Sequence, residues 1–417
     1  MDFPTFLTNI NDALVAENGD GLAYLLRPTS PHGKALVKQF RSGQLRISLN
    51  KYRGSIQQPW DDIAIEYVLV CEHIAKKRYR DAFRGQIQLV NHFHTFFIEN
   101  QGWTLPALFA VLRDLRVLAF DVRPQSIPVE ADADARQSGE KSEHMEEAAR
   151  TIQKAFTACV NDRVSPLDRS RVWGVYYVVG LIMKCYFRIR KISLSKNILA
   201  ALEVNKHIPP LSSFPRSHQV TFRYYLGMLN FLNEDFSKAE EQLTLAFYNC
   251  CHQARDNEAR ILTYLIPLRL MKGHLPTSDL LEPFPALDTL FKPFVSAIRA
   301  GDLSAYDAAL QASEQRLLDL ALWLTLERGR ELCLRGLFRK VWVASDHSTR
   351  IPISAFHTAL HMSGVDVPME EAECFVANMI YKGYLAGYIS HEKQMLVLSK
   401  KNAVPRAADR PQPFLPT

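Results

Sequence analysis

The chain has 417 residues, of which 47% are hydrophobic and 23% charged, and its formal net charge is +6. This composition excludes an intrinsically disordered protein and provides enough apolar side chains for a large core or an extended stack of helices. No apolar run approaches the roughly 20 residues that a membrane-spanning helix needs, and Met1 to Leu14 lack the basic start and apolar centre of a signal peptide.

Residues 1–345 show helical spacing of apolar side chains, with few prolines or glycines inside the segments and almost no β-branched alternation. The segments are short and follow one another closely, which predicts stacked helical hairpins. The predicted helices are Pro4 to Ala16, Trp60 to Lys76, Tyr79 to Asn100, Leu105 to Phe120, Glu146 to Val160, Arg171 to Ile189, Ser195 to Asn205, Ser217 to Leu232, Phe236 to Cys250 and Asn257 to Lys272.

Positive charge is concentrated in two stretches of this helical region. Lys34 to Arg53 contains six cations and no acid, and Lys184 to Arg223 contains eight cations and the single acid Glu203. Such patches attract phosphate backbones and acidic proteins alike, and a solvated helix face accounts for them equally well. Charge alone therefore does not choose between RNA and an acidic partner.

A low-complexity segment interrupts the helices at Val122 to Glu143. It contains Pro124 and Pro128 and alternates acids with alanines from Glu130 to Ala135. A segment with so little to bury is predicted to be a mobile loop.

The strongest repeat pattern lies at Leu226 to Ala246. Gly227 and Ala239 are small at the positions where two antiparallel helices must approach closely, and Phe231 and Leu243 fill the space beside them. This spacing is typical of a tetratricopeptide-like unit. Because one such unit cannot bury its apolar face alone, we expect neighbours on both sides, in a right-handed solenoid.

The hydrophobic period changes after residue 345. A helix is predicted over Glu327 to Ala344, a short strand over Thr349 to Ile351 and a second helix over Ile353 to Met362. A third helix begins after Pro368 and ends at Gly383. Two apolar runs, Tyr384 to Ile389 and Met395 to Leu398, then flank a polar turn and predict a β-hairpin.

Helix, strand, helix, helix and hairpin is the element order of a winged helix. Most winged helices bind nucleic acid, but a substantial minority serve only in protein association, so the fold alone does not fix the function.

Several linked motifs resemble the PCI domain. They are Tyr225 to Gly227, Asp235 to Glu240, Arg260 to Pro267, Ala297 to Leu303, Leu326 to Arg328, Leu337 to Val341, Tyr381 to His391 and Leu396 to Asn402. Within that family the chain is most similar to the branch containing the signalosome subunit 12-like proteins and the PCI subunit of the nuclear-pore-associated transcription and mRNA export complex.

The resemblance implies a mainly α fold, a helical-repeat solenoid capped by a C-terminal winged helix. It places N-terminal repeats at 1–210 with the loop at 122–143, the helical half of the PCI domain at 211–326, the winged helix at 327–402 and a flexible tail at 403–417. Family members are non-enzymatic subunits that dock on a second PCI-type scaffold, and several bind a small acidic disordered protein shared with the proteasome lid. A nuclear location, including the nuclear pore, and a cytoplasmic one are also expected.

Two sets of cations are candidate contacts. The winged helix and its flanks offer phosphate contacts at Arg335, Arg339, Lys340, Arg350, Lys382, Lys393, Lys400 and Lys401. The upstream basic segment offers contacts to an acidic partner at Lys184, Arg188, Arg190, Lys191 and Lys196.

Two hypotheses remain open on this basis. In the first, the subunit forms a platform that brings RNA or DNA to a complex for transcription-coupled mRNA processing and export. In the second, the winged helix is purely a protein-docking surface of a signalosome-like or proteasome-lid-like assembly, and any nucleic acid is bound by partners.

The sequence contains no recognisable catalytic or metal-binding motif. The chain lacks the glycine-rich phosphate-binding motifs, the nucleophile elbow and the H-E-x-x-H zinc motif. His357 and His361 are four residues apart, but no further ligand stands at a recognisable spacing. The seven cysteines are scattered and mostly on apolar helical faces, which favours reduced thiols in a soluble intracellular protein. We therefore expect no enzyme, no cofactor and no metal.

Overall fold

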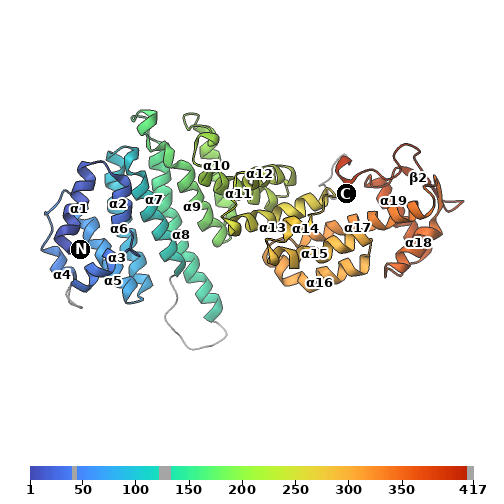
Figure 1. Ribbon diagram of the computed structural model, residues 1–417, viewed down its shortest axis with the longest axis horizontal. Helices are drawn as coiled ribbons and strands as arrows, with labels where there is room; N and C mark the ends of the chain where they lie inside the picture. Colours follow the sequence, from blue (N-terminus) through green and yellow to red (C-terminus); the bar gives the residue numbers. More distant parts are fainter. Residues whose placement is uncertain (40–44, 122–132, 411–417) are drawn as a thin grey trace. The chain divides into compact units, whose positions relative to one another are not determined.

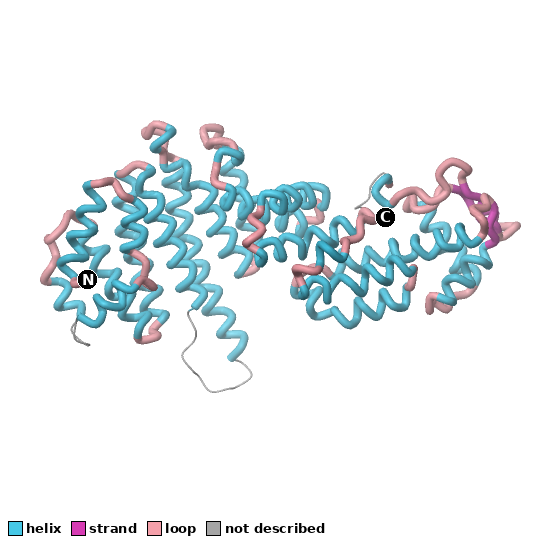
Figure 2. The backbone as a smooth tube through the Cα atoms, viewed as in Figure 1, coloured by secondary structure: helices cyan, strands magenta, loops and turns pink. Residues whose placement is uncertain are grey.

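The computed structural model describes residues 1–39, 45–121 and 133–410, with side chains throughout except at 133–142. The chain forms two compact units, Met1–Tyr225 and Leu226–Thr417. Helices make up most of both, and the strands of the described ranges lie near the C-terminal end of the second unit (Figure 2). The predicted fold class, a mainly helical repeat protein with a C-terminal winged helix, is confirmed.

The first unit is a stack of helices in which neighbours along the chain pack side by side (Figure 1). Helix α5 packs on α6, α6 on α7, α7 on α8 and α8 on α9. The helices are α1 (Phe3–Val15), α2 (Gly19–Leu25), α3 (Pro31–Gln39), α4 (Leu45–Asn50), α5 (Trp60–Ala75), α6 (Tyr79–Glu99), α7 (Leu105–Asp121), α8 (Ala133–Val160), α9 (Val175–Arg188), α10 (Ser195–Val204) and α11 (Arg216–Leu232), the last of which continues into the second unit.

Helix α6 illustrates why this stack forms. Phe83, Val90, Phe93 and Phe97 follow helical spacing and are all almost fully buried, so one apolar face is covered on both sides by neighbouring helices. The buried amide of Gln86 donates a 3.0 Å hydrogen bond to the carbonyl of Val111 in α7. Apolar burial and one buried hydrogen bond therefore hold the pair together.

Sequence periodicity predicted most helices here to within one or two residues, but α8 starts well before Glu146. It begins at Ala133, so the second half of the predicted loop at 122–143 is helical, while 122–132 lies outside the described residues. Alanine, arginine, glutamine, glutamate and lysine between 133 and 143 all have high helix propensity. Helices α2, α3 and α4 were not predicted.

The second unit continues with further helices before the winged helix. Its first pair shows the close approach that the repeat pattern predicts, because a Cβ added to Gly227 would lie 2.7 Å from the Cγ of Leu243. Ala239 and Leu243 are fully buried. The helices are α12 (Phe236–Asn249), α13 (Arg255–Met271), α14 (Ser278–Leu281), α15 (Pro285–Ala300), α16 (Leu303–Asp319) and α17 (Trp323–Ala344).

The winged helix consists of α17, α18 (Ile353–Met362), α19 (Met369–Tyr381) and the strands β1 (Arg350–Pro352), β2 (Gly387–Ser390) and β3 (Met395–Leu398). The strands form one antiparallel sheet in the order β1-β3-β2. Its first hairpin strand starts at Gly387 rather than at Tyr384 as predicted, because Tyr384 and Leu385 are both 2% exposed and belong to the core.

Residues 403–410, expected to belong to a flexible tail, are packed against the winged helix. The amide of Ala386 donates a 2.9 Å hydrogen bond to the carbonyl of Ala403, and Ala403 and Ala407 are buried. The guanidinium of Arg410 lies 4.0 Å from the ring centroid of Tyr384. Residues 411–417 lie outside the described residues.

Within the described ranges, no helix combines the length and the apolar character needed to cross a lipid bilayer.

Candidate nucleic-acid and partner interfaces

The outer face of the sheet carries a row with an arginine and a tyrosine. Arg350 of β1 and Tyr388 of β2 both lie opposite Val397 of the central strand β3. Directly opposite residues share a face, and the alternate residues Leu396 and Leu398 are buried, so this row faces solvent. Tyr388 is 63% exposed. The row thus offers a cation beside an exposed aromatic ring.

Five of the eight predicted phosphate contacts are exposed and make no side-chain hydrogen bond or ion pair with the rest of the described chain. Lys393 lies in the hairpin turn, and two lysines follow β3 directly. The five are Arg339, Arg350, Lys393, Lys400 and Lys401.

The other three are engaged inside the second unit. The half-buried guanidinium of Arg335 donates two hydrogen bonds to the carbonyl of Pro405. Lys340 donates to the carbonyl of Ala300 at the end of α15. Lys382 forms an ion pair with Glu331. Burial and the charge of Arg339 also lower the pKa of Arg335. These three cations stabilise the fold and are poorly placed to meet a phosphate.

Helix α19 occupies the position of a recognition helix, yet its solvent face is not basic. Glu371, Cys374, Asn378 and Tyr381 are exposed at helical spacing, and no lysine or arginine occurs between Met369 and Tyr381. A helix with this face would repel the phosphates that line a DNA groove. Tyr381 is 78% exposed, and exposed tyrosines are enriched at protein–protein interfaces.

The turn between β2 and β3 contacts α19 through a histidine. His391 Nδ1 lies 2.8 Å from one carboxylate oxygen of Glu373. The hydrogen bond that the His391 ring donates to Glu373, and then the charge of Glu373, raise the pKa of His391. One acid of α19 is therefore held by the turn that carries Lys393.

The predicted partner-binding segment is divided by the fold into two groups. Lys184 and Arg188 lie on α9, where the guanidinium of Arg188 is 4.7 Å from the ring centroid of Phe120 in α7. The others follow the helix. Lys191 forms a 2.5 Å ion pair with Glu146 of α8. Arg190, with a left-handed φ of 58°, and Lys196 are exposed.

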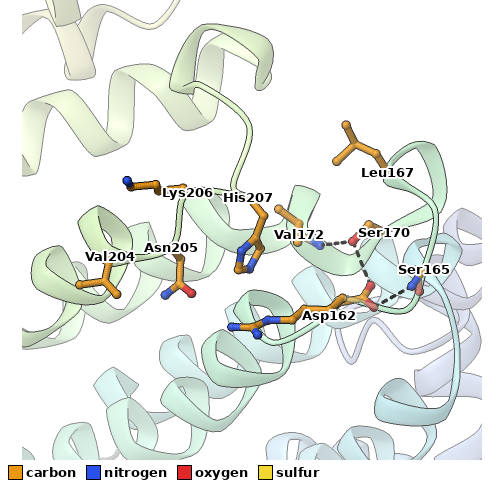
Figure 3. A pocket seen from close by; sticks show the side chains of 10 residues that line it. Asp162, Ser165, Leu167, Ser170, Val172, Val204, Asn205, Lys206 and His207 are labelled. Carbon is orange, nitrogen blue, oxygen red and sulfur yellow. Dashed lines mark hydrogen bonds between the residues drawn. The ribbon is translucent and has the colours of Figure 1, made fainter.

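A cavity in the first unit was not predicted from the sequence (Figure 3). It has a volume of about 540 Å³ and lies between the loop after α8 and the loop after α10. Arg163, Lys206 and His207 line it together with the apolar side chains of Leu167 and Val204. No sequence motif marks it, since its two walls lie about 40 residues apart in the chain.

Asp162, on the cavity wall, organises the loop beside it. Its carboxylate accepts hydrogen bonds from the amide of Arg171 (2.8 Å) and the hydroxyl of Ser170 (2.9 Å), and Arg171 Nη2 lies 3.4 Å away. Burial opposes ionisation, but these interactions outweigh it and hold the pKa of Asp162 far below its usual range. Figure 3 shows the carboxylate turned toward Ser165 and Ser170. Asp162 therefore has a structural role.

The histidines and cysteines form no metal cluster within the described ranges, where no three metal-ligating side chains come together. His357 Nε2 lies 2.8 Å from the carbonyl of Val367, whereas His361 lies 3.9 Å from Asp366. All seven cysteines are free. Burial raises the pKa of Cys159 and Cys185 to about 12, so neither thiol is reactive.

Comparison with known proteins identifies the relatives of this chain. Residues 308–400 match the model of the PCI domain. The chain is 37% identical over 420 residues to "Protein CSN12 homolog" of Schizosaccharomyces pombe, covering 96% of this chain and 97% of that protein. It is 40% identical over 333 residues to the protein of the same name in Neurospora crassa, covering 73% of each chain.

A more distant animal relative extends the comparison. "PCI domain-containing protein 2" of Danio rerio is 28% identical over 404 residues, covering 96% of each chain. The match to the PCI domain covers the winged helix and the end of the helical half described above, and the Schizosaccharomyces pombe relative matches over nearly the whole chain. The chain therefore belongs to the family of CSN12 homologues, proteins with a PCI domain, as its motifs predicted.

Proposed function

We propose that the chain is a non-enzymatic scaffold subunit that docks through its winged helix on a second PCI-type protein and presents a nucleic-acid-binding surface beside the docking site. The observation that carries this proposal is the separation of charge on the winged helix. The solvent face of α19 bears an acid and no cation, whereas the sheet, the hairpin turn and the end of β3 bear four of the five exposed cations.

The docking role rests on α19. Its exposed Tyr381, together with Met362 at the end of α18, which is 82% exposed, provides apolar area that a partner would cover. Cys374 and Asn378 are small enough to let another helix or strand approach.

The proposed nucleic-acid role rests on the exposed face of the sheet and on the cations at the two ends of β3. Arg350 and Tyr388 flank Val397 on the exposed sheet face, and Lys393 and Lys400 extend the charge along β3. Arginine and lysine contacts to phosphates supply most of the affinity of non-specific nucleic-acid binding, and an exposed ring adds stacking. RNA and DNA are both compatible with this surface.

A small acidic disordered protein is the second proposed partner. The cations that follow α9, Arg190 and Lys196, are exposed, so they are available to an acidic segment, whereas Lys191 already pairs with Glu146. Such a complex would act in transcription-coupled mRNA processing and export, in the nucleus and at the nuclear pore, with a cytoplasmic fraction.

The alternative is a purely protein-docking subunit of a signalosome-like or proteasome-lid-like assembly. One observation favours it: Arg335, Lys340 and Lys382 are already engaged within the protein. This leaves fewer cations for a phosphate backbone than the sequence suggested.

The two functions are separated by nucleic-acid binding of the full chain. Fluorescence anisotropy with a short single-stranded RNA and a short duplex would be measured at several salt concentrations for the wild type and for Arg350→Glu/Lys393→Glu. Arg163→Glu/Lys206→Glu in the cavity of the first unit is a control with the same change of charge. The proposal expects weaker binding and a shallower salt dependence only for the first variant. Equal binding by all three proteins would show that Arg350 and Lys393 are not the nucleic-acid contacts, and no binding by any of them would leave the purely protein-docking function.

The docking role is tested by substituting Tyr381→Glu and identifying stoichiometric partners after affinity purification from native extract. The proposal expects the wild type to retain a second PCI-type protein and a small acidic protein, and the variant to lose the former. Recovery of both at the same ratio with the variant would show that α19 is not the docking surface.

A further inference from the structure

Two neighbouring helices of the first unit carry aromatic and basic residues at three matching positions, and the buried Leu181 of α9 stands at the fourth, opposite Arg113 of α7. On α7, Phe109, Arg113, Arg116 and Phe120 are separated by 4, 3 and 4 residues, so they lie on one face. On α9, Tyr177, Lys184 and Arg188 occupy the corresponding positions at intervals of 7 and 4. These seven residues are called the aromatic–basic stripe below.

Contacts at both ends show that the two halves of the stripe lie side by side. The rings of Phe109 and Tyr177 stack with centroids 4.0 Å apart and planes 29° apart. Eleven residues further along both helices, the Arg188 guanidinium lies 4.7 Å from the centroid of the Phe120 ring. Helices α7 and α9 therefore run in the same direction and in register, as neighbours in the stack (Figure 1).

The cations Arg113, Arg116 and Lys184 lie between the two ends of the stripe. Burial raises the pKa of Tyr177, and the nearby charges of Arg113 and Arg116 act against this shift. Burial raises the pKa of Cys185 to about 12, again opposed by Arg116 and by Lys184. Arg116 thus lies within electrostatic range of both Tyr177 and the next turns of α9.

Helix α11 continues the surface at its aromatic end. The ring of His218 lies edge-on to Phe109 at 5.8 Å and 5.3 Å from Tyr177. Its approach depends on Gly180, where an added Cβ would lie 3.0 Å from Thr221 of α11. Three parallel helices therefore contribute to one surface of the first unit.

The stripe combines available cations with buried polar atoms that lack partners. Of its cations, Arg113 pairs with Asp114 at 3.2 Å, whereas the side chain of Arg188 is exposed. The Nε of Arg116 and the Nδ1 of His218 are buried without a hydrogen-bond partner in the described chain. At the same time Phe120 is 49% exposed. The exposed guanidinium of Arg188, the unpartnered Nε of Arg116 and the exposed ring of Phe120 together point to an anionic ligand with groups that stack.

We propose that the aromatic–basic stripe binds single-stranded nucleic acid. Grooves for single strands combine cations that follow the phosphates with aromatic rings on which bases stack, and the stripe has both. Three of its four cations are arginines, whose planar fork matches phosphate oxygens and stacks on rings. Phe109 and Phe120 are separated by roughly 16 Å along α7, at 1.5 Å per residue, so the stripe accommodates a short run of nucleotides.

This site lies wholly within the first unit, and the inference does not depend on the proposed role of the winged helix. It separates Lys184 and Arg188 from the rest of the predicted partner-binding segment. Arg190 and Lys196 remain available to an acidic protein, while the two α9 cations join Arg113 and Arg116 in contacting phosphates.

The test uses the full chain with a fluorescein-labelled unstructured 12-nucleotide RNA and the DNA of the same sequence. Arg188→Glu and Phe120→Ala change exposed side chains, and Arg116→Gln removes a half-buried charge while keeping a polar side chain of similar length. Thermal denaturation of each variant shows whether it is folded. Arg163→Glu/Lys206→Glu is the charge control, and Tyr248→Ala, at a ring 73% exposed on α12, is the aromatic control.

We expect the substitutions of cations and the substitution of the aromatic ring to change affinity and salt dependence in different ways. Removing one phosphate contact decreases the slope of log K against log salt by about 0.7 for a single strand, so Arg116→Gln and Arg188→Glu are expected to weaken binding and flatten this slope. Phe120→Ala is expected to weaken binding at least about fivefold with an unchanged slope, because stacking carries no charge. RNA and DNA affinities measured together identify which strand the stripe prefers.

Three results would overturn the inference. One is unchanged affinity in all folded stripe variants. Another is an equal loss in the two controls. The third is a labelled 12-residue glutamate peptide that binds more tightly than the nucleic acids and depends on Arg188 and Phe120, since the occupant would then be an acidic protein. The Arg350→Glu/Lys393→Glu variant separates the sites: loss of binding there alone supports the winged-helix surface and refutes the stripe.

Discussion

Substitution of Asp162 by asparagine tests the structural role assigned to this buried carboxylate. The carboxylate accepts hydrogen bonds from the amide of Arg171 and the hydroxyl of Ser170, and it faces the Arg171 guanidinium. An asparagine keeps one acceptor oxygen and places an NH₂ group against these donors. The hydroxyl of Ser170 can rotate to accept, but the amide of Arg171 cannot.

The expected loss of stability follows from these contacts. Arg171 is 12% exposed and Asp162 has no exposed side-chain surface, so the change leaves a buried guanidinium without its counter-ion and a backbone donor without an acceptor. Losses of this kind cost about 3 kcal/mol. In a unit of this size 1 kcal/mol corresponds to about 2–4 °C, so the melting transition of the first unit should fall by about 6–12 °C.

Differential scanning calorimetry of the full chain at several pH values measures this loss. The folded-state pKa of Asp162 is lowered, so its contribution is present above the unfolded value of about 3.9 and is lost as pH falls toward the folded value. The difference between wild type and variant should therefore begin to shrink below about pH 4 and keep decreasing as the pH falls further. Asp168→Asn in the same loop, at an exposed position, is the control. A loss below about 1 kcal/mol, or one that is the same at pH 3 and pH 7, would refute the reasoning.

Three further predictions concern the second unit. Leu243→Ala should destabilise it by about 2–5 kcal/mol in urea denaturation, whereas Leu318→Ala, at a side chain 53% exposed, should have little effect. NMR titration should place the pKa of His391 above the ordinary value of about 6.5 in the wild type and nearer to it in Glu373→Gln. The contribution of that pair to stability is present below the ordinary value and lost as pH rises through the folded one. Arg410→Ala should speed hydrogen exchange at the amide of Ala386, whose acceptor lies in the packed tail; unchanged exchange would show that Arg410 does not hold it.

The sequence predicts local structure well wherever one helix face or one strand carries the information. The helical period from Trp60 and from Tyr79 placed the starts of α5 and α6, and the small residues Gly227 and Ala239 predicted the close packing that the structure has. The start of β2 was wrong because an apolar run such as Tyr384 to Ile389 fits both a strand and a buried connection. How much of this run pairs as a strand depends on the surrounding helices.

Whether a cation is free to bind a phosphate depends on partners that are far away in the sequence. For this reason the candidate site was predicted only in part. The carbonyl that occupies Arg335 is 70 residues away, and the acid that pairs with Lys382 is 51 residues away. Neither contact leaves a signal in the local pattern. The same holds for the aromatic–basic stripe, since Phe109 and Tyr177 are 68 residues apart and each looks like an ordinary half-buried aromatic residue on its own helix.

The number of available cations limits how strongly salt can weaken nucleic-acid binding. If the five exposed cations of the winged helix and its flanks all contact phosphates, the slope of log K against log salt for a single strand is no steeper than about −3.5, at about −0.7 per contact. The four cations of the stripe would add about −2.8. A measured slope steeper than −3.5 therefore requires a second cationic surface on this chain. If the slope stays within that limit, becomes shallower by about 1.4 in Arg350→Glu/Lys393→Glu and is unchanged in the stripe variants, the winged helix alone accounts for binding and the stripe has another role.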